Sequence, residues 1–117
     1  PRSYRQRMPK KMRRAALRAA LAAKAAESGI VIVEDLNLSA PKTRLMAEVL
    51  QNVVGDASAL ILMPQKDTTY ETVIRAANNL PDTKVLLASY LNIRDLLGFE
   101  KVVMPLRTLE VITAHLG

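Results

Sequence analysis

Polar side chains that could carry phosphoryl chemistry follow three of the predicted strands of this chain. They are Glu34, Asp35, Gln65, Lys66, Asp67, Ser89 and Tyr90. The carboxyl ends of parallel strands meet at one edge of a sheet, so an aspartate, a hydroxyl and a lysine gathered there could form a phospho-acceptor pocket. The set is incomplete, because Lys101 precedes its strand instead of following it. Catalysis is therefore not the favoured prediction.

Other signals of chemistry are missing from the sequence. The chain has no cysteine, and its four glycines form neither a G-x-G-x-x-G motif nor a phosphate-binding loop. The single histidine, His115, is interpreted as a solvated residue at a helix end. We therefore expect no enzymatic activity, no cofactor and no metal site.

Positive charge is concentrated at the start of the chain. Residues 1–24 contain nine basic residues and no acid, although the whole chain has a net charge of only +6. The nine are Arg2, Arg5, Arg7, Lys10, Lys11, Arg13, Arg14, Arg18 and Lys24. The rest of the chain has eight basic and eleven acidic residues and is mildly acidic. This asymmetry predicts a polyanionic partner, with nucleic acid favoured over an anionic membrane.

The helix predicted from residue 10 onwards favours nucleic acid further. Lys10, Lys11, Arg13, Arg14 and Arg18 cover about 160° of its surface. The helix lacks the broad apolar face of a membrane-surface helix, and no apolar run approaches the roughly 18 residues needed to span a bilayer. Like charges at these spacings repel one another unless a polyanion offsets them. The alternative is a solvated charged helix without a partner.

A second candidate phosphate site lies in the segment SAPKTR. Lys42, Thr43 and Arg44 open a predicted helix, whose N-terminal N–H groups suit phosphate. On spacing alone an ordinary helix start is favoured, with Ser39 or Thr43 as the capping residue and Pro41 setting the turn.

Helical and apolar segments alternate along the whole chain. Helical periodicity marks residues 10–29, 39–55, 68–80, 92–99 and 106–116, and short apolar runs mark 30–35, 59–64, 84–88 and 101–105. Runs of this kind are typical of parallel strands buried on both faces. The pattern predicts a three-layer α/β/α fold around a four-stranded parallel sheet. We expect a single domain over residues 1–117, with a basic tail and helix over 1–28 and an α/β body over 29–117.

Three stretches carry a resemblance to a known family. MPKKMRRAALRAALAAK, VIVEDLNLSAPKTR and NLPDTKVLLASYLNIRDLLGFEKVVM occur in order and together span most of the chain. They resemble the bacterial-type large-subunit ribosomal proteins of the L-four family. The resemblance implies the strand order 1-4-2-3 and binding to large-subunit rRNA early in assembly, near the peptide exit tunnel. It also implies contacts with neighbouring large-subunit ribosomal proteins, and in some relatives binding to their own mRNA leader.

The chain departs from the family pattern in two places. Family members carry an N-terminal region with a long glycine- and arginine-rich extension, so the chain is expected to correspond to the C-terminal portion. Asn78 stands where relatives commonly have arginine, so an RNA contact from that helix is not carried over from the family to this chain. The resemblance places the protein in the ribosome of the cytoplasm or of an organelle.

A different class of function is the alternative. A small α/β ligand-binding or phosphorelay domain of the receiver type, with an incidental basic tail, would use the strand-end residues named first. Binding that weakens steeply with salt and needs residues 1–24 favours the ribosomal interpretation. Labelling of Asp35 by acetyl phosphate would favour the other.

Overall fold

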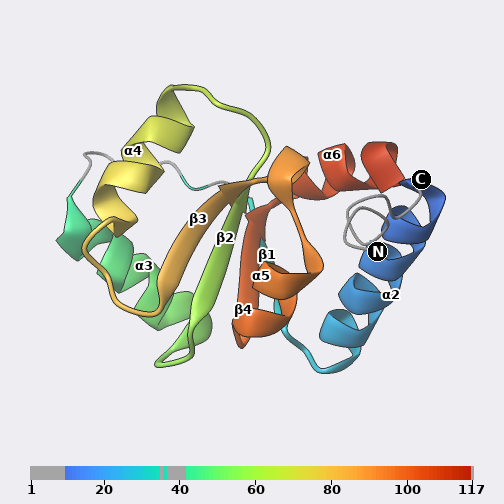
Figure 1. The fold of residues 1–117 in the computed structure, drawn as a ribbon. Helices are drawn as coiled ribbons and strands as arrows, with labels where there is room; N and C mark the ends of the chain where they lie inside the picture. Colours follow the sequence, from blue (N-terminus) through green and yellow to red (C-terminus); the bar gives the residue numbers. More distant parts are fainter. Residues whose placement is uncertain (1–9, 35, 37–41, 117) are drawn as a thin grey trace, which may run out of the picture.

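The computed structural model describes residues 10–34, 36 and 42–116, and helices alternate with strands throughout (Figure 1). The elements are α2 (Lys10–Ala26), β1 (Ile30–Val33), α3 (Thr43–Val54), β2 (Ala59–Met63), α4 (Thr68–Ala77), β3 (Thr83–Leu87), the 3₁₀ turn η1 (Ala88–Tyr90), α5 (Ile93–Gly98), β4 (Lys101–Pro105) and α6 (Leu106–Leu116). Every predicted helix and strand is present. Most differences are of one to three residues at an element's end.

The four strands form one all-parallel sheet in the order β1-β4-β2-β3. This confirms the predicted fold class and the strand order that the resemblance implied. The prediction that all four strands are buried on both faces is wrong for the two edge strands. Every residue of β2 is buried, whereas β1 and β3 are half-buried and Ile32 of β1 is 46% exposed. Only the central strands are covered by helices over their whole length.

Two apolar clusters fill the spaces on either side of the sheet. On one face, Met46 and Leu50 of α3 and Val73 of α4 pack against Ile61 and its neighbours on the strands. On the other face, α2, α5 and α6 cover the alternate residues of the same strands, such as Leu60 and Val102. Because successive strand side chains point to opposite faces, the continuous apolar runs supply both cores. The result is the three-layer arrangement visible in Figure 1.

The largest shift in an element's end concerns the start of α3. Its first helical residue is Thr43, and residues 39–41, which were expected to begin the helix, lie outside the described residues. The helix ends as predicted at Gly55, which has a positive φ of 65° and donates its N–H to the carbonyls of Leu50 and Gln51. Glycine adopts this backbone conformation without a Cβ clash, so it ends the helix at low cost.

Candidate nucleic-acid interface

The first turns of α2 present an exposed cluster of cations. Lys10, Lys11, Arg13 and Arg14 are all exposed, and Leu17 is the first residue of the helix that packs in a core cluster. Arg2, Arg5 and Arg7 lie outside the described residues. The cations at residues 10–14 therefore lie on the exposed turns of α2 that precede Leu17.

Two of these cations lie on the same face of α2 as the residues that pack on the body, but nearer the start of the helix. Leu17, Ala20 and Leu21 join the cluster beneath α2, whereas Met12 on the opposite side is 58% exposed. At 100° per residue, Lys10 and Arg14 lie on the same stripe as Leu17 and Leu21, one to three turns earlier. The packing stripe thus continues into a basic stripe where the helix passes the end of α6 (Figure 1).

Two cations of the N-terminal run have structural partners far along the chain. The Arg18 guanidinium donates a hydrogen bond to the carbonyl oxygen of Leu116, in the last turn of α6. The Lys24 ammonium donates to the carbonyl oxygen of Phe99 over 2.6 Å, and Lys24 is only 7% exposed. Arg18 remains exposed, so its structural bond does not withdraw it from the candidate set. Lys24, which was counted in the basic run but was not a candidate contact, is part of the packed interior.

Gly29 makes room for the buried lysine stem. The Gly29 N–H donates to the carbonyl of Lys24 over 2.8 Å, which brings the turn after α2 back against the helix. A Cβ at position 29 would lie 2.6 Å from Cδ of Lys24, closer than van der Waals contact allows. The absence of a side chain at Gly29 therefore leaves room for the Lys24 stem.

Among the described residues, no side chain caps the start of α3. Lys42 occupies the N-cap position in an extended conformation, and its side chain makes no capping hydrogen bond. Thr43 is already helical, so the expectation that it caps the helix is wrong, while Ser39 and Pro41 lie outside the described residues. Lys42 and Arg44 are both exposed, and Thr43 is half-buried. The helix start offers backbone N–H groups beside two cations, as a phosphate site requires.

The strand-end residues do not assemble a phosphoryl site among the described parts of the chain. Asp67 caps α4: its carboxylate accepts from the Tyr70 N–H over 3.0 Å and from the Gln65 amide over 3.2 Å. These two hydrogen bonds hold the pKa of Asp67 below its ordinary value of 3.8. Lys101 is the first residue of β4 and therefore lies at the amino ends of the strands, away from the residues that follow them. Its ammonium donates to the carbonyl of Ser28. Asp35 lies outside the described residues.

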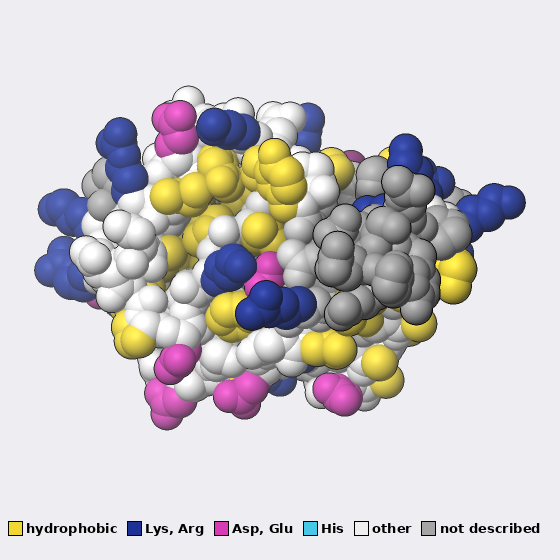
Figure 2. All heavy atoms as spheres, viewed as in Figure 1, with side chains coloured by type: hydrophobic (Ala, Val, Ile, Leu, Met, Phe, Trp, Pro, Cys, Tyr) yellow, Lys and Arg dark blue, Asp and Glu magenta, His cyan; other side chains and the backbone are white. Residues whose placement is uncertain are grey.

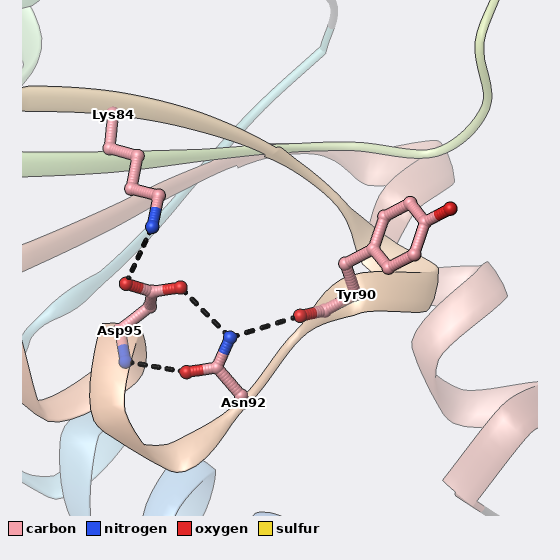
Figure 3. Close-up of polar contacts among 4 residues, drawn as sticks. All are labelled: Lys84, Tyr90, Asn92 and Asp95. Atoms are coloured by element: carbon pink, nitrogen blue, oxygen red, sulfur yellow. Dashed lines mark hydrogen bonds and ion pairs between the residues drawn. The ribbon is translucent and has the colours of Figure 1, made fainter.

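A polar cluster on β3 and α5 was missed from the sequence (Figure 3). Lys84 forms an ion pair of 2.9 Å with Asp95, and Asn92 caps α5 by accepting from the Asp95 N–H over 2.8 Å. The Asn92 amide also donates to the other Asp95 oxygen and to the carbonyl of Tyr90. The hydrogen bond from Lys84, and then that from Asn92, lower the pKa of Asp95 below 3.8. These are residues of the KV and N-x-x-D motifs, so part of the resemblance rests on fold-maintaining contacts.

A buried hydroxyl was also missed. Thr108 of α6 is fully buried and donates to the carbonyl oxygen of Leu62 on β2 over 2.9 Å. The bond ties the last helix to the central strand. Nothing in the local sequence distinguishes this threonine from exposed ones such as Thr113.

Basic side chains occur over much of the surface. Figure 2 shows Lys and Arg side chains at both ends of this face and also near its centre, beside an acidic side chain and areas of apolar surface. Within the described ranges, no three His, Asp or Glu side chains are grouped so as to hold a metal ion. None of the described helices is long and apolar enough to cross a bilayer.

The fold and this distribution of charge define a basic three-layer α/β domain with no assembled catalytic centre in its described part. Comparison with known proteins then identifies the family. The chain matches the model of the Ribosomal protein L4/L1 family over residues 1–115, and it belongs to that family. The family consists of structural ribosomal proteins and not of enzymes, as the sequence had predicted for this chain.

Curated relatives are named large ribosomal subunit protein uL4. The chain is 45% identical to the one from Oceanobacillus iheyensis, 41% to that from Pelotomaculum thermopropionicum and 38% to that from Alkaliphilus oremlandii, each over 104 residues. The aligned region covers 89% of this chain but only 48–49% of each relative. The chain therefore spans about half the length of the curated relatives it matches.

Proposed function

We propose that this chain is a structural constituent of the large ribosomal subunit and binds large-subunit rRNA through its basic N-terminal segment. The observation that carries the proposal is the exposed cluster on α2: Lys10, Lys11, Arg13 and Arg14 stand on turns that precede the packed part of the helix. Cations placed there reach a phosphate backbone without disturbing the core. Membership of the L4/L1 family and the names of the uL4 relatives support the same partner.

The contacts of this segment are mainly with phosphates. Duplex RNA has a deep, narrow major groove that side chains cannot read, so arginine and lysine recognise its backbone and shape. Arg2, Arg5 and Arg7 continue the same acid-free run and extend the contact. Arg18 contributes through those guanidinium donors that the Leu116 carbonyl does not use.

A second contact involves Lys42, Thr43 and Arg44 at the start of α3. The helix start, which no described side chain caps, and its two exposed cations support a phosphate site there. Since α3 packs on one face of the sheet and α2 on the other, the two sites meet different rRNA segments. Replacing Lys42 and Arg44 by alanine should weaken RNA binding and leave thermal stability nearly unchanged. Lost stability with intact affinity would show that the segment only starts the helix.

The family also suggests when, where and with which partners the chain acts, and we include these points in the proposal. They comprise action early in subunit assembly near the peptide exit tunnel, contact with neighbouring ribosomal proteins, and location in the ribosome of the cytoplasm or of an organelle. Binding to its own mRNA leader belongs to the same proposal. Contact with a protein neighbour is supported by Ile32 on the edge strand β1 and by Leu106 at the start of α6, which are 46% and 50% exposed.

Crosslinking to purified large-subunit rRNA, followed by mapping of the crosslinked residues, tests the proposal. We expect crosslinks to concentrate at residues 1–18 and 42–44. The matched control is the acidic body, where Lys66 and Arg107 are exposed but stand apart from both basic sites in sequence. Crosslinks spread evenly over all exposed cations would contradict a defined interface.

A further inference from the structure

A cleft lies where the first turns of α2 pass the end of α6 and the turn η1. Its inner part is a cavity of about 80 Å³ lined mainly by aliphatic side chains, among them Leu17, Leu91 and Val111. Its outer part, of about 220 Å³, shares Leu17, Ser89 and Leu91 with the inner one. Three segments far apart in the sequence therefore enclose a single apolar hollow that opens to solvent.

The rim of this cleft is basic. Lys10, Arg13 and Arg14 line the outer cavity on the α2 side, and the hydroxyl residue Ser89 lies on the η1 side. None of the described residues lining either cavity is acidic. An apolar floor beside cations and one hydroxyl suits a ligand with a flat, weakly polar body and an attached anion. A nucleotide has this composition.

The size of the cleft and its place in the molecule restrict the ligand further. Pockets for drug-sized molecules have volumes of roughly 300–1,000 Å³, well above the inner cavity. The rim cations also belong to the cluster proposed to contact rRNA, so a ligand here is continuous with that RNA. Bases within a duplex are stacked and cannot enter, whereas unpaired bases can be splayed out and held by side chains.

We infer that this cleft binds one unpaired nucleotide of the RNA, with its base against Leu17 and Leu91 and its phosphates at Lys10 and Arg14. The inference rests on the proposed function, because it assigns a ligand to part of the same basic face. It adds a preference for a bulge or loop to the recognition of backbone charge. The inner cavity is lined by aliphatic and not aromatic side chains. We therefore expect one bound base to raise the affinity by about fivefold to tenfold, at the lower end of the range for a base that stacks on a side chain.

The test uses the 117-residue chain and two hairpin RNAs. One carries a single bulged adenosine, and the other carries an abasic residue at the same position, so the two have the same phosphates. We expect the chain to bind the adenosine hairpin about fivefold to tenfold more tightly. Ser89→Phe, which fills the cleft from an exposed position, should abolish this preference. Thr113→Phe, at an exposed α6 position outside the cleft lining, is the control and should keep the preference.

The outcomes separate this inference from the function on which it rests. Equal, salt-dependent binding of the two hairpins would overturn the nucleotide site and leave the rRNA contact intact, and so would a preference that survives Ser89→Phe. Failure to bind either RNA would overturn both proposals. Should Ser89→Phe unfold, Val111→Phe fills the inner cavity from a position that is 36% exposed and gives the same test.

Discussion

Replacing Lys24 by methionine tests whether this lysine stabilises the fold instead of contacting RNA, as the exposed cations of α2 are proposed to do. Methionine keeps most of the buried stem and removes only the ammonium that donates to the Phe99 carbonyl over 2.6 Å. A hydrogen bond from a charged donor contributes about 1.5–3 kcal/mol, and removing the buried charge offsets part of that loss. We expect Lys24→Met to lower the free energy of unfolding by about 1–2 kcal/mol.

Lys24→Ala should cost more, because it also removes three buried methylene groups at about 0.8 kcal/mol each. The expected loss is about 3–4 kcal/mol. Lys11→Met is the matched control on the same helix. Its side chain is exposed and makes no described packing contact, so its effect on stability should stay within about 0.5 kcal/mol.

Urea unfolding and RNA titration of the same three variants provide the assay. Lys11→Met should lower the steepness of the salt dependence of binding by about 0.7–0.9, the value for one phosphate contact, whereas Lys24→Met should leave it unchanged. The reasoning would be refuted if Lys24→Met were as stable as the parent chain. A reduced salt dependence in that variant would refute it equally.

Three further predictions concern the contacts that hold the body together. The lowered pKa of Asp95 stabilises the fold above about pH 3.8, and this stabilisation is lost as the pH falls through the folded-state pKa, so Asp95→Asn should show a smaller loss of unfolding free energy on acidification than the parent chain. An equal loss would count against the ion pair. Asn92→Ala removes the cap of α5 and should cost about 0.5–2 kcal/mol in urea unfolding, against less than about 0.5 kcal/mol for the exposed Asn79→Ala. Thr108→Val leaves the Leu62 carbonyl without its partner and should cost about 1–3 kcal/mol, and a thermal midpoint equal to that of the parent would contradict that role.

The fold was predictable because its signals are local. Each strand is a short apolar run, and each helix shows its own periodicity with a glycine or a polar cap nearby, as at Gly55 and Asp67. The half-buried state of β1 could not be seen in the same way. It depends on β1 being at the edge of the sheet, and the strand order came from the resemblance and not from the composition of the strand.

The roles of individual cations were less predictable. Arg18 and Lys24 look like the other basic residues of their helix, but their partners lie 98 and 75 residues further along the chain. Only the packed structure reveals such contacts. The Asn92–Asp95 cap, by contrast, spans three residues and has the form of a capping motif, so closer attention to N-x-x-D would have found it.

The salt dependence of RNA binding tests the central claim most directly. If about five to seven cations of the N-terminal segment contact phosphates, log K for large-subunit rRNA should fall against log salt with a slope of roughly −4 to −6. Replacing Lys10, Lys11, Arg13 and Arg14 together should reduce the steepness by about three, while the body still unfolds cooperatively because its packing begins at Leu17. A slope near zero in the parent chain, or one that the four substitutions leave unchanged, would contradict the claim that this segment binds RNA.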